Sequence, residues 1–82
     1  MRPLYFTGYD IGSEFVHSAT LDMNNKIVVA PKSIMHFGNP AAVIKNIIKE
    51  NKKKGINEKN SFFAFTGSGG KVFSDLIKAN GI

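Results

Sequence analysis

One short segment near the start of the chain combines residue types that can bind phosphate and magnesium. An apolar strand runs into Asp10, and Gly12 and Ser13 follow almost at once. Glycine lets the backbone approach a ligand closely, and the N–H groups of such a turn can bind an anion. A carboxylate that closes a buried strand is costly unless something binds it. The segment therefore predicts a phosphate and hydrated-magnesium site, and the alternative is a β-hairpin whose glycine turn the aspartate caps.

Three strands are expected to carry this turn, over residues 4–11, 15–21 and 27–37. Alternate side chains of the first strand face opposite sides of the sheet, and those on both sides are largely apolar or aromatic. This pattern predicts that the strand is buried on both faces. Gly8 inside that strand predicts a close approach by another element. Pro31 cannot donate to a sheet ladder, so the third strand is expected at an edge. The three strands together predict an antiparallel meander.

A helix is expected next, because Asn39 is a good N-cap and Pro40 suits the first helical position. Apolar residues recur at helical spacing over 43–48, and lysines fill the last turn, where cations suit the helix dipole. Gly55 is a plausible residue to end the helix. The lysine run is interpreted as a solvated helix end.

A fourth strand, residues 61–65, follows this helix and should pair parallel with the first strand. The pattern predicts an α/β fold with sheet order 3-2-1-4, and a second helix from about Lys71. The fourth strand then has no outer neighbour, and a bare apolar edge is a pairing hazard. We therefore expect the fold to be truncated before a fifth strand, or the sheet to be completed by another chain.

The composition narrows the class of protein. The chain has 82 residues, which allows one domain over 1–82, a formal charge of +5 and no cysteine. Without cysteine this segment cannot ligate an iron–sulfur cluster through thiolates. Its basic residues are nearly all lysines, whereas nucleic-acid surfaces usually show arginine and interleaved aromatics, so nucleic-acid binding is not expected. With no long apolar run and no signal peptide, a cytoplasmic protein without a membrane span is expected.

The order of elements resembles the first half of a ribonuclease H-like fold, as found in the actin–hexokinase–heat-shock-protein superfamily. Residues 8–13, GYDIGS, resemble that superfamily's first phosphate motif. Within it, the chain resembles the N-terminal segment of the BadF/BadG/BcrA/BcrD-type ATPases. These include activators of 2-hydroxyacyl-CoA dehydratases and ATPase subunits of benzoyl-CoA reductase. The Gly-Asn-Pro at 38–40 and the TGSGG at 66–70 support this narrower resemblance, the latter standing where the family usually has TGYGR.

The resemblance implies ATP or ADP with magnesium as ligands of the complete protein. Asp10 would order the magnesium hydration shell, and the loop after the fourth strand would line the same cleft as the first turn. It implies no catalytic residue in this segment. The residues that would contact the phosphates are Gly12, Ser13, Glu14, Gly67, Ser68 and Gly69.

Two departures from the family pattern bear on nucleotide binding. Glu14 places a negative charge where the family usually continues with threonines, and Gly70 stands in place of an arginine. The family's second phosphate motif, adenosine-binding glycines and cluster cysteines belong to another lobe. The resemblance thus implies that this chain is the N-terminal phosphate-binding segment of an ATP-dependent activator, and that the activated enzyme is specific for CoA substrates. We do not expect this segment to hydrolyse ATP alone.

Other readings remain open at this point. A non-catalytic binding or assembly module would keep the fold without the chemistry, and Glu14 and Gly70 favour it. The N-terminal piece of a sugar- or acetate-kinase-type phosphotransferase would share the phosphate motif. A ribonuclease H-type nuclease would need several converging carboxylates, and only Asp10 is well placed. Partners would be the nucleotide, the remaining lobe, or a second copy at the fourth strand's edge. His17 and His36 are interpreted as satisfied or surface histidines.

Overall fold

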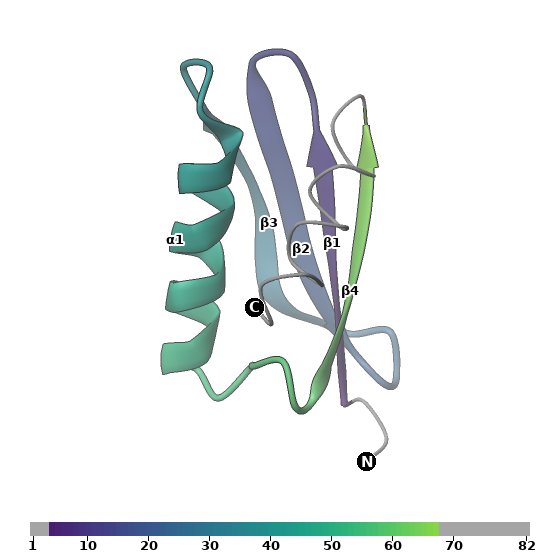
Figure 1. Cartoon of the computed structure of the whole chain (residues 1–82). Coiled ribbons are helices and arrows are strands. Elements are labelled where there is room, and N and C mark those ends of the chain that lie inside the picture. Colours follow the sequence, from purple (N-terminus) through teal and green to yellow (C-terminus); the bar gives the residue numbers. More distant parts are fainter. Residues whose placement is uncertain (1–3, 68–82) are drawn as a thin grey trace.

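The computed structural model describes residues 4–67 as four strands and one helix (Figure 1). In chain order the elements are β1 Tyr5–Ile11, β2 Phe15–Asp22, β3 Ile27–Met35, α1 Pro40–Lys53 and β4 Ser61–Gly67. The helix expected from Lys71, and the loop residues Ser68 and Gly69, lie outside the described residues. The predicted elements up to β4 are therefore confirmed, with their ends moved by at most two residues.

The strands form one mixed sheet in the order β3-β2-β1-β4. β1 pairs antiparallel with β2 and parallel with β4, and β2 pairs antiparallel with β3. The parallel pair is reached through α1, since two parallel neighbours need a long crossover. The α/β architecture and the sheet order 3-2-1-4 were predicted correctly from the order of the elements.

β3 lies at the edge of the described sheet, as Pro31 predicted. Its register against β2 shifts, because Thr20 faces Val29 whereas Ser18 faces Lys32. Three residues of β3 therefore span two of β2, which is a bulge beside the proline. The strand ends at Met35, two residues earlier than expected. The chain then turns through positive φ at Phe37 and Gly38, which have φ of 49° and 81°.

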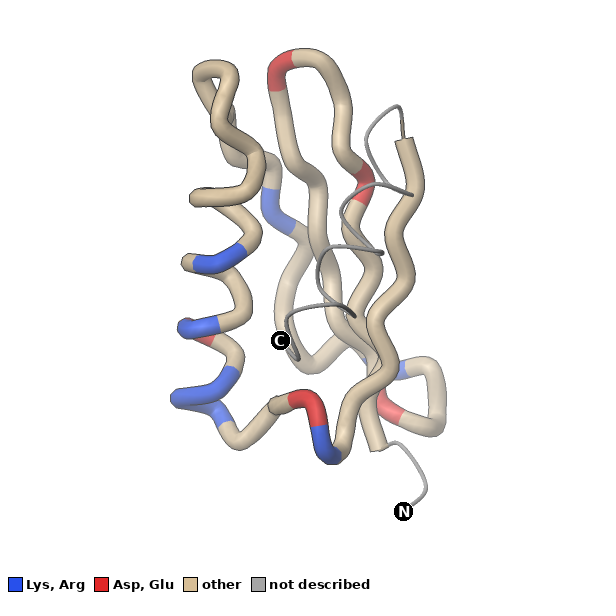
Figure 2. Tube along the Cα trace, in the orientation of Figure 1, with Lys and Arg blue, Asp and Glu red and all other residues tan. Residues whose placement is uncertain are grey.

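The ends of α1 follow the local signals in the sequence. The Asn39 side chain accepts a hydrogen bond from the Ala42 N–H at 3.2 Å, and Pro40 opens the helix. Gly55 lies just beyond the C-cap with φ of 83°. Figure 2 shows the basic positions gathered mainly along α1, in agreement with a solvated helix surface. Within residues 4–67, no helix has the length and apolar character needed to cross a bilayer.

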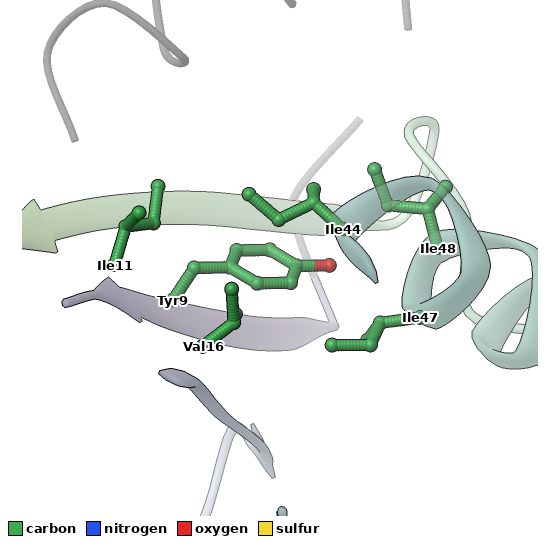
Figure 3. Packing of buried hydrophobic residues seen from close by; sticks show 6 residues of the cluster. All are labelled: Tyr9, Ile11, Val16, Ile44, Ile47 and Ile48. Atoms are coloured by element: carbon green, nitrogen blue, oxygen red, sulfur yellow. The ribbon is translucent and has the colours of Figure 1, made fainter. Parts of the chain in front are cut away.

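The core lies between α1 and one face of the sheet, and Figure 3 shows the ring of Tyr9 directed toward the helix. The Tyr9 ring stacks on that of Phe65 with centroids 5.0 Å apart. Each large side chain buried here contributes about 1.5–3 kcal/mol of hydrophobic stabilisation. The cluster consists of Tyr9, Ile11, Val16, Ile44, Ile47 and Ile48.

The opposite face of the sheet is open in the described part of the chain. Phe6 and Phe62, which lie there on β1 and β4, keep 41% and 58% of their surface exposed. The prediction that β1 is buried on both faces is therefore wrong for residues 4–67, because α1 covers only one face. Gly8 also faces this side, and a Cβ there would meet no described atom within 4 Å. The close approach predicted at Gly8 is not found among these residues.

Candidate functional site

The parallel register of β1 and β4 brings the two predicted loops to one edge of the sheet. Asp10 lies opposite Thr66, and Ile11 lies opposite Gly67. The arrows of β1 and β4 end side by side in Figure 1, so the turn after Ile11 starts next to the end of β4. The carboxyl ends of parallel strands are where α/β sheets bind ligands.

Gly67 is held unusually close to the backbone of β1. Its φ is 93°, and an added Cβ would overlap the carbonyl oxygen of Ile11 and lie 2.8 Å from the N and C atoms of that residue. A side chain at this position would push β4 away from β1, because the obstructing atoms are backbone. Glycine is therefore required here by the joining of the two strands, whether or not a ligand binds.

The turn between β1 and β2 presents part of the expected set of N–H groups. The Gly12 N–H donates to the Phe15 carbonyl oxygen at 2.9 Å, so the hairpin itself occupies it. Among residues 4–67, no backbone acceptor takes the N–H of Ser13 or Glu14, and both residues are exposed. These two donors, together with the Ser13 hydroxyl, are the ones in this turn available to an anion.

Asp10 lies on the open face of the sheet and is exposed. Its carboxylate is therefore hydrated and needs no ligand to offset burial, and the physical reason is the pleat of the strand. Tyr9 and Ile11 point toward α1, so Asp10 between them points the other way. Across residues 4–67, no three His, Cys, Asp or Glu side chains form a group that could hold a metal. Asp10 can offer a single carboxylate, which suits a magnesium ion that keeps most of its waters.

A hollow of about 730 Å³ lies on the same open face, next to Asp10. Its lining includes the small residues Gly8 and Ala64 and the aromatic rings of Phe6 and Phe62, whose centroids lie 6.5 Å apart. The volume is within the range of small-molecule sites, which are mostly apolar with a few polar groups. This hollow was not predicted from the sequence, because β1 was expected to be buried on both faces.

Among residues 4–67, the charged side chains at this edge of the sheet are the acidic ones of Asp10 and Glu14. Figure 2 shows acidic positions at the β1–β2 hairpin and on β1, while the basic positions lie mainly along α1, with others on β3 and in the loops. One of these, Lys32 of β3, lines the hollow beside Asp10. Asp10 and the exposed Glu14 would both repel a bare phosphate. A phosphate chain that carries magnesium has a smaller negative charge. The site therefore fits a magnesium-bound phosphate better than a free one.

One residue that contacts the turn was not assigned to the site from the sequence. His36 is 7% exposed, and its Nε2 lies 2.9 Å from the Gly12 carbonyl oxygen. The interpretation of His36 as a satisfied histidine is confirmed, but its partner was not foreseen. The two residues are 24 positions apart in the sequence, and no local spacing pattern connects them.

Of the predicted phosphate contacts, the structure gathers Gly12, Ser13, Glu14 and Gly67 at one edge with Asp10 beside them, and Ser68 and Gly69 fall outside the described residues. No protein-family model matches the chain. Comparisons with curated proteins and with solved structures likewise found no match. The function of the chain is therefore inferred from the sequence motif and from this geometry.

Proposed function

We propose that this chain is the N-terminal phosphate-binding segment of an ATP-dependent activator, similar to the BadF/BadG/BcrA/BcrD-type ATPases. In this proposal the complete protein energises an enzyme that acts on a CoA-linked substrate. One observation supports the proposal most directly. The parallel pairing of Ile11 with Gly67 joins the GYDIGS turn to the end of β4, so both glycine-containing segments share one sheet edge.

The proposed roles follow from the groups available. The N–H groups of Ser13 and Glu14 would donate to phosphate oxygens, and the carboxylate of Asp10 would accept hydrogen bonds from the waters of a bound magnesium ion. Magnesium would neutralise part of the phosphate charge. Phosphoryl-transfer proteins work chiefly through positioning and electrostatics, and a nucleotide held here would draw a second lobe toward this edge.

A titration of the amide NMR spectrum with magnesium-ADP tests this proposal. We expect shifts at residues 10–14 that saturate at millimolar ligand or below, and much weaker shifts with ADP plus a chelator. Asn24 and Asn25 serve as the internal control, because they lie in the β2–β3 turn, at the opposite end of β2 from residues 10–14. Equal shifts in both turns, or no shift in residues 10–14 with a well-dispersed spectrum, would argue against a phosphate site.

Two matched variants test whether Glu14 lies next to the bound nucleotide. Glu14→Gln removes the negative charge beside the proposed anion, so it should bind magnesium-ADP more tightly than the unmodified chain. Glu58→Gln removes one negative charge from an exposed position in the α1–β4 connection, and it should leave the affinity unchanged. If both variants bind equally, the effect is one of net charge, and Glu14 is not next to the ligand.

A second candidate is a binding or assembly module that keeps the fold without nucleotide chemistry. The exposed row formed by Phe6 and Phe62 favours it, as does the negative charge of Glu14. Within the described sheet β4 pairs only with β1, so its outer side could pair with a second copy of the chain. Sedimentation velocity over a range of concentrations tests this reading. A dimer that persists without nucleotide would support it, and a monomer at all concentrations would count against pairing through β4.

A further inference from the structure

The side chain of His36 joins two backbone segments that are remote in the sequence. Its Nε2 contacts the carbonyl oxygen of Gly12 at 2.9 Å, and its Nδ1 accepts a hydrogen bond from the Gly38 N–H at 3.0 Å. The backbone N–H of His36 also donates to the Glu14 carbonyl oxygen at 2.9 Å. One residue thus holds the β1–β2 turn at both Gly12 and Glu14.

These partners fix the protonation state of the ring. A backbone N–H can only donate, so Nδ1 must carry the free lone pair that faces Gly38. A carbonyl oxygen can only accept, so Nε2 must carry the proton that faces Gly12. The hydrogen-bond network therefore requires the neutral, Nε2-protonated tautomer of His36.

The same residue ties the turn to the start of the helix. The carbonyl oxygen of His36 accepts a hydrogen bond from the Asn39 N–H at 2.8 Å, and Asn39 is the N-cap of α1. Phe37 and Gly38, between them, adopt positive φ. The turn is thereby linked through His36 to an element that packs in the core, rather than only to its own hairpin.

We propose that His36 is a positioning residue for the β1–β2 turn. By holding the carbonyl groups of Gly12 and Glu14, it keeps the intervening N–H groups of Ser13 and Glu14 directed toward a bound anion. The part of this inference that concerns the anion rests on the proposed function. The part that concerns the order of the turn stands on the hydrogen bonds alone.

Two variants of His36 separate its two ring contacts. In His36→Gln the terminal amide nitrogen can reach the place of Nε2 and still donate to Gly12. In His36→Asn the amide oxygen can replace Nδ1 and still accept from Gly38, but nothing reaches Gly12. We expect His36→Gln to keep the turn ordered. We expect His36→Asn to speed exchange of the two hydrogen-bonded amides at the turn, those of Gly12 and of position 36, by about fivefold, the scale of one lost hydrogen bond. His17→Gln is the control, because His17 is exposed and bonds to Ser33 instead.

Binding supplies a second readout. His36→Asn should weaken magnesium-ADP binding by about fivefold, and His36→Gln should retain most of the affinity. If both variants bind and exchange like the unmodified chain, His36 does not position the turn. If the unmodified chain shows no binding but His36→Asn still speeds amide exchange at Gly12 and position 36, the proposed function fails and the positioning role stands.

The unmodified chain offers a measurement that does not depend on any variant folding. Long-range proton–nitrogen NMR spectra distinguish the two neutral tautomers and the charged ring. We expect the protonated nitrogen of His36 to be Nε2 at neutral pH. An Nδ1-protonated or charged ring would overturn the inference, since neither can accept from Gly38 and donate to Gly12.

Discussion

Replacing Gly67 by alanine tests whether the two loops of the candidate site are joined by a backbone contact. The residue has φ of 93°, and its added Cβ would overlap the carbonyl oxygen of Ile11. Gly55 is a matched control with nearly the same φ of 83°, and nothing lies within 4 Å of an added Cβ there. The pair therefore separates the cost of the backbone conformation from the cost of the close approach.

The two substitutions share the conformational cost. An L-residue with positive φ costs roughly 1–2 kcal/mol, and the lower entropy of the unfolded chain offsets about 0.4–1 kcal/mol of it. Gly55→Ala should therefore lower the free energy of unfolding by about 1 kcal/mol. At Gly67 the overlap must be relieved by moving backbone, and such overpacking costs about 1–3 kcal/mol more. Gly67→Ala should thus cost about 2–4 kcal/mol in all.

Urea unfolding followed by circular dichroism measures both values, and amide exchange at Thr66 and Gly67 locates the effect. We expect Gly67→Ala to be the more destabilising of the two, with faster exchange at the end of β4. If the two variants agree within about 0.5 kcal/mol and the Ile11–Gly67 pairing survives, the close approach does not constrain this edge. Glycine would then not be required at position 67 for structural reasons.

Other substitutions test the core and the helix cap, each by urea unfolding. Among the described residues the buried Tyr9 hydroxyl has no hydrogen-bond partner, so Tyr9→Phe should raise the free energy of unfolding by up to about 1 kcal/mol; a loss of stability would reveal a partner. Burial raises the pKa of Tyr9 above its ordinary 10.0, so the unfolded chain loses this proton before the folded chain does as the pH rises. The stabilisation of the folded state by the neutral hydroxyl is therefore complete below pH 10, and the free energy of unfolding falls as the pH rises from there toward the folded-state pKa. This fall should be absent in Tyr9→Phe. Thr7 and Thr20 share a buried hydroxyl–hydroxyl bond of 2.8 Å, so Thr7→Val should cost about 1–3 kcal/mol, and adding Thr20→Val should recover part of it unless the two sites are independent. Asn39→Ala should cost about 1 kcal/mol and Asn39→Asp much less, whereas equal costs would mean that the cap bond to Ala42 is not what matters.

The elements up to β4 could be predicted because their signals are local. Asn39 and Pro40 mark the start of a helix through the hydrogen-bonding and φ preferences of the two residues themselves. Pro31 marks an edge strand because it lacks an N–H, wherever the rest of the chain lies. The sheet order follows from the same information, because a helical crossover between strands allows few arrangements.

Glycines show where sequence reasoning was insufficient. Gly8 was interpreted as a close approach, but the described structure leaves open space beside it, while Gly67 makes the close contact. In the structure Gly8 lies within β1 and Gly67 ends β4, and the sequence does not say which neighbour each one faces. The register of β1 against β4 decides it, and that register depends on residues more than 50 positions apart.

The candidate site likewise has some features that the sequence determines and others that only the tertiary structure decides. By itself, the sequence determined that a carboxylate, a glycine turn and backbone N–H donors occur within five residues, because these are properties of adjacent groups. Only the tertiary structure decided that Asp10 faces the open side of the sheet, that the hairpin occupies the Gly12 N–H, and that His36 holds the turn. These depend on strand pairing and on the packing of α1 on one face, and hydrogen bonds between remote segments leave no periodic pattern in the chain.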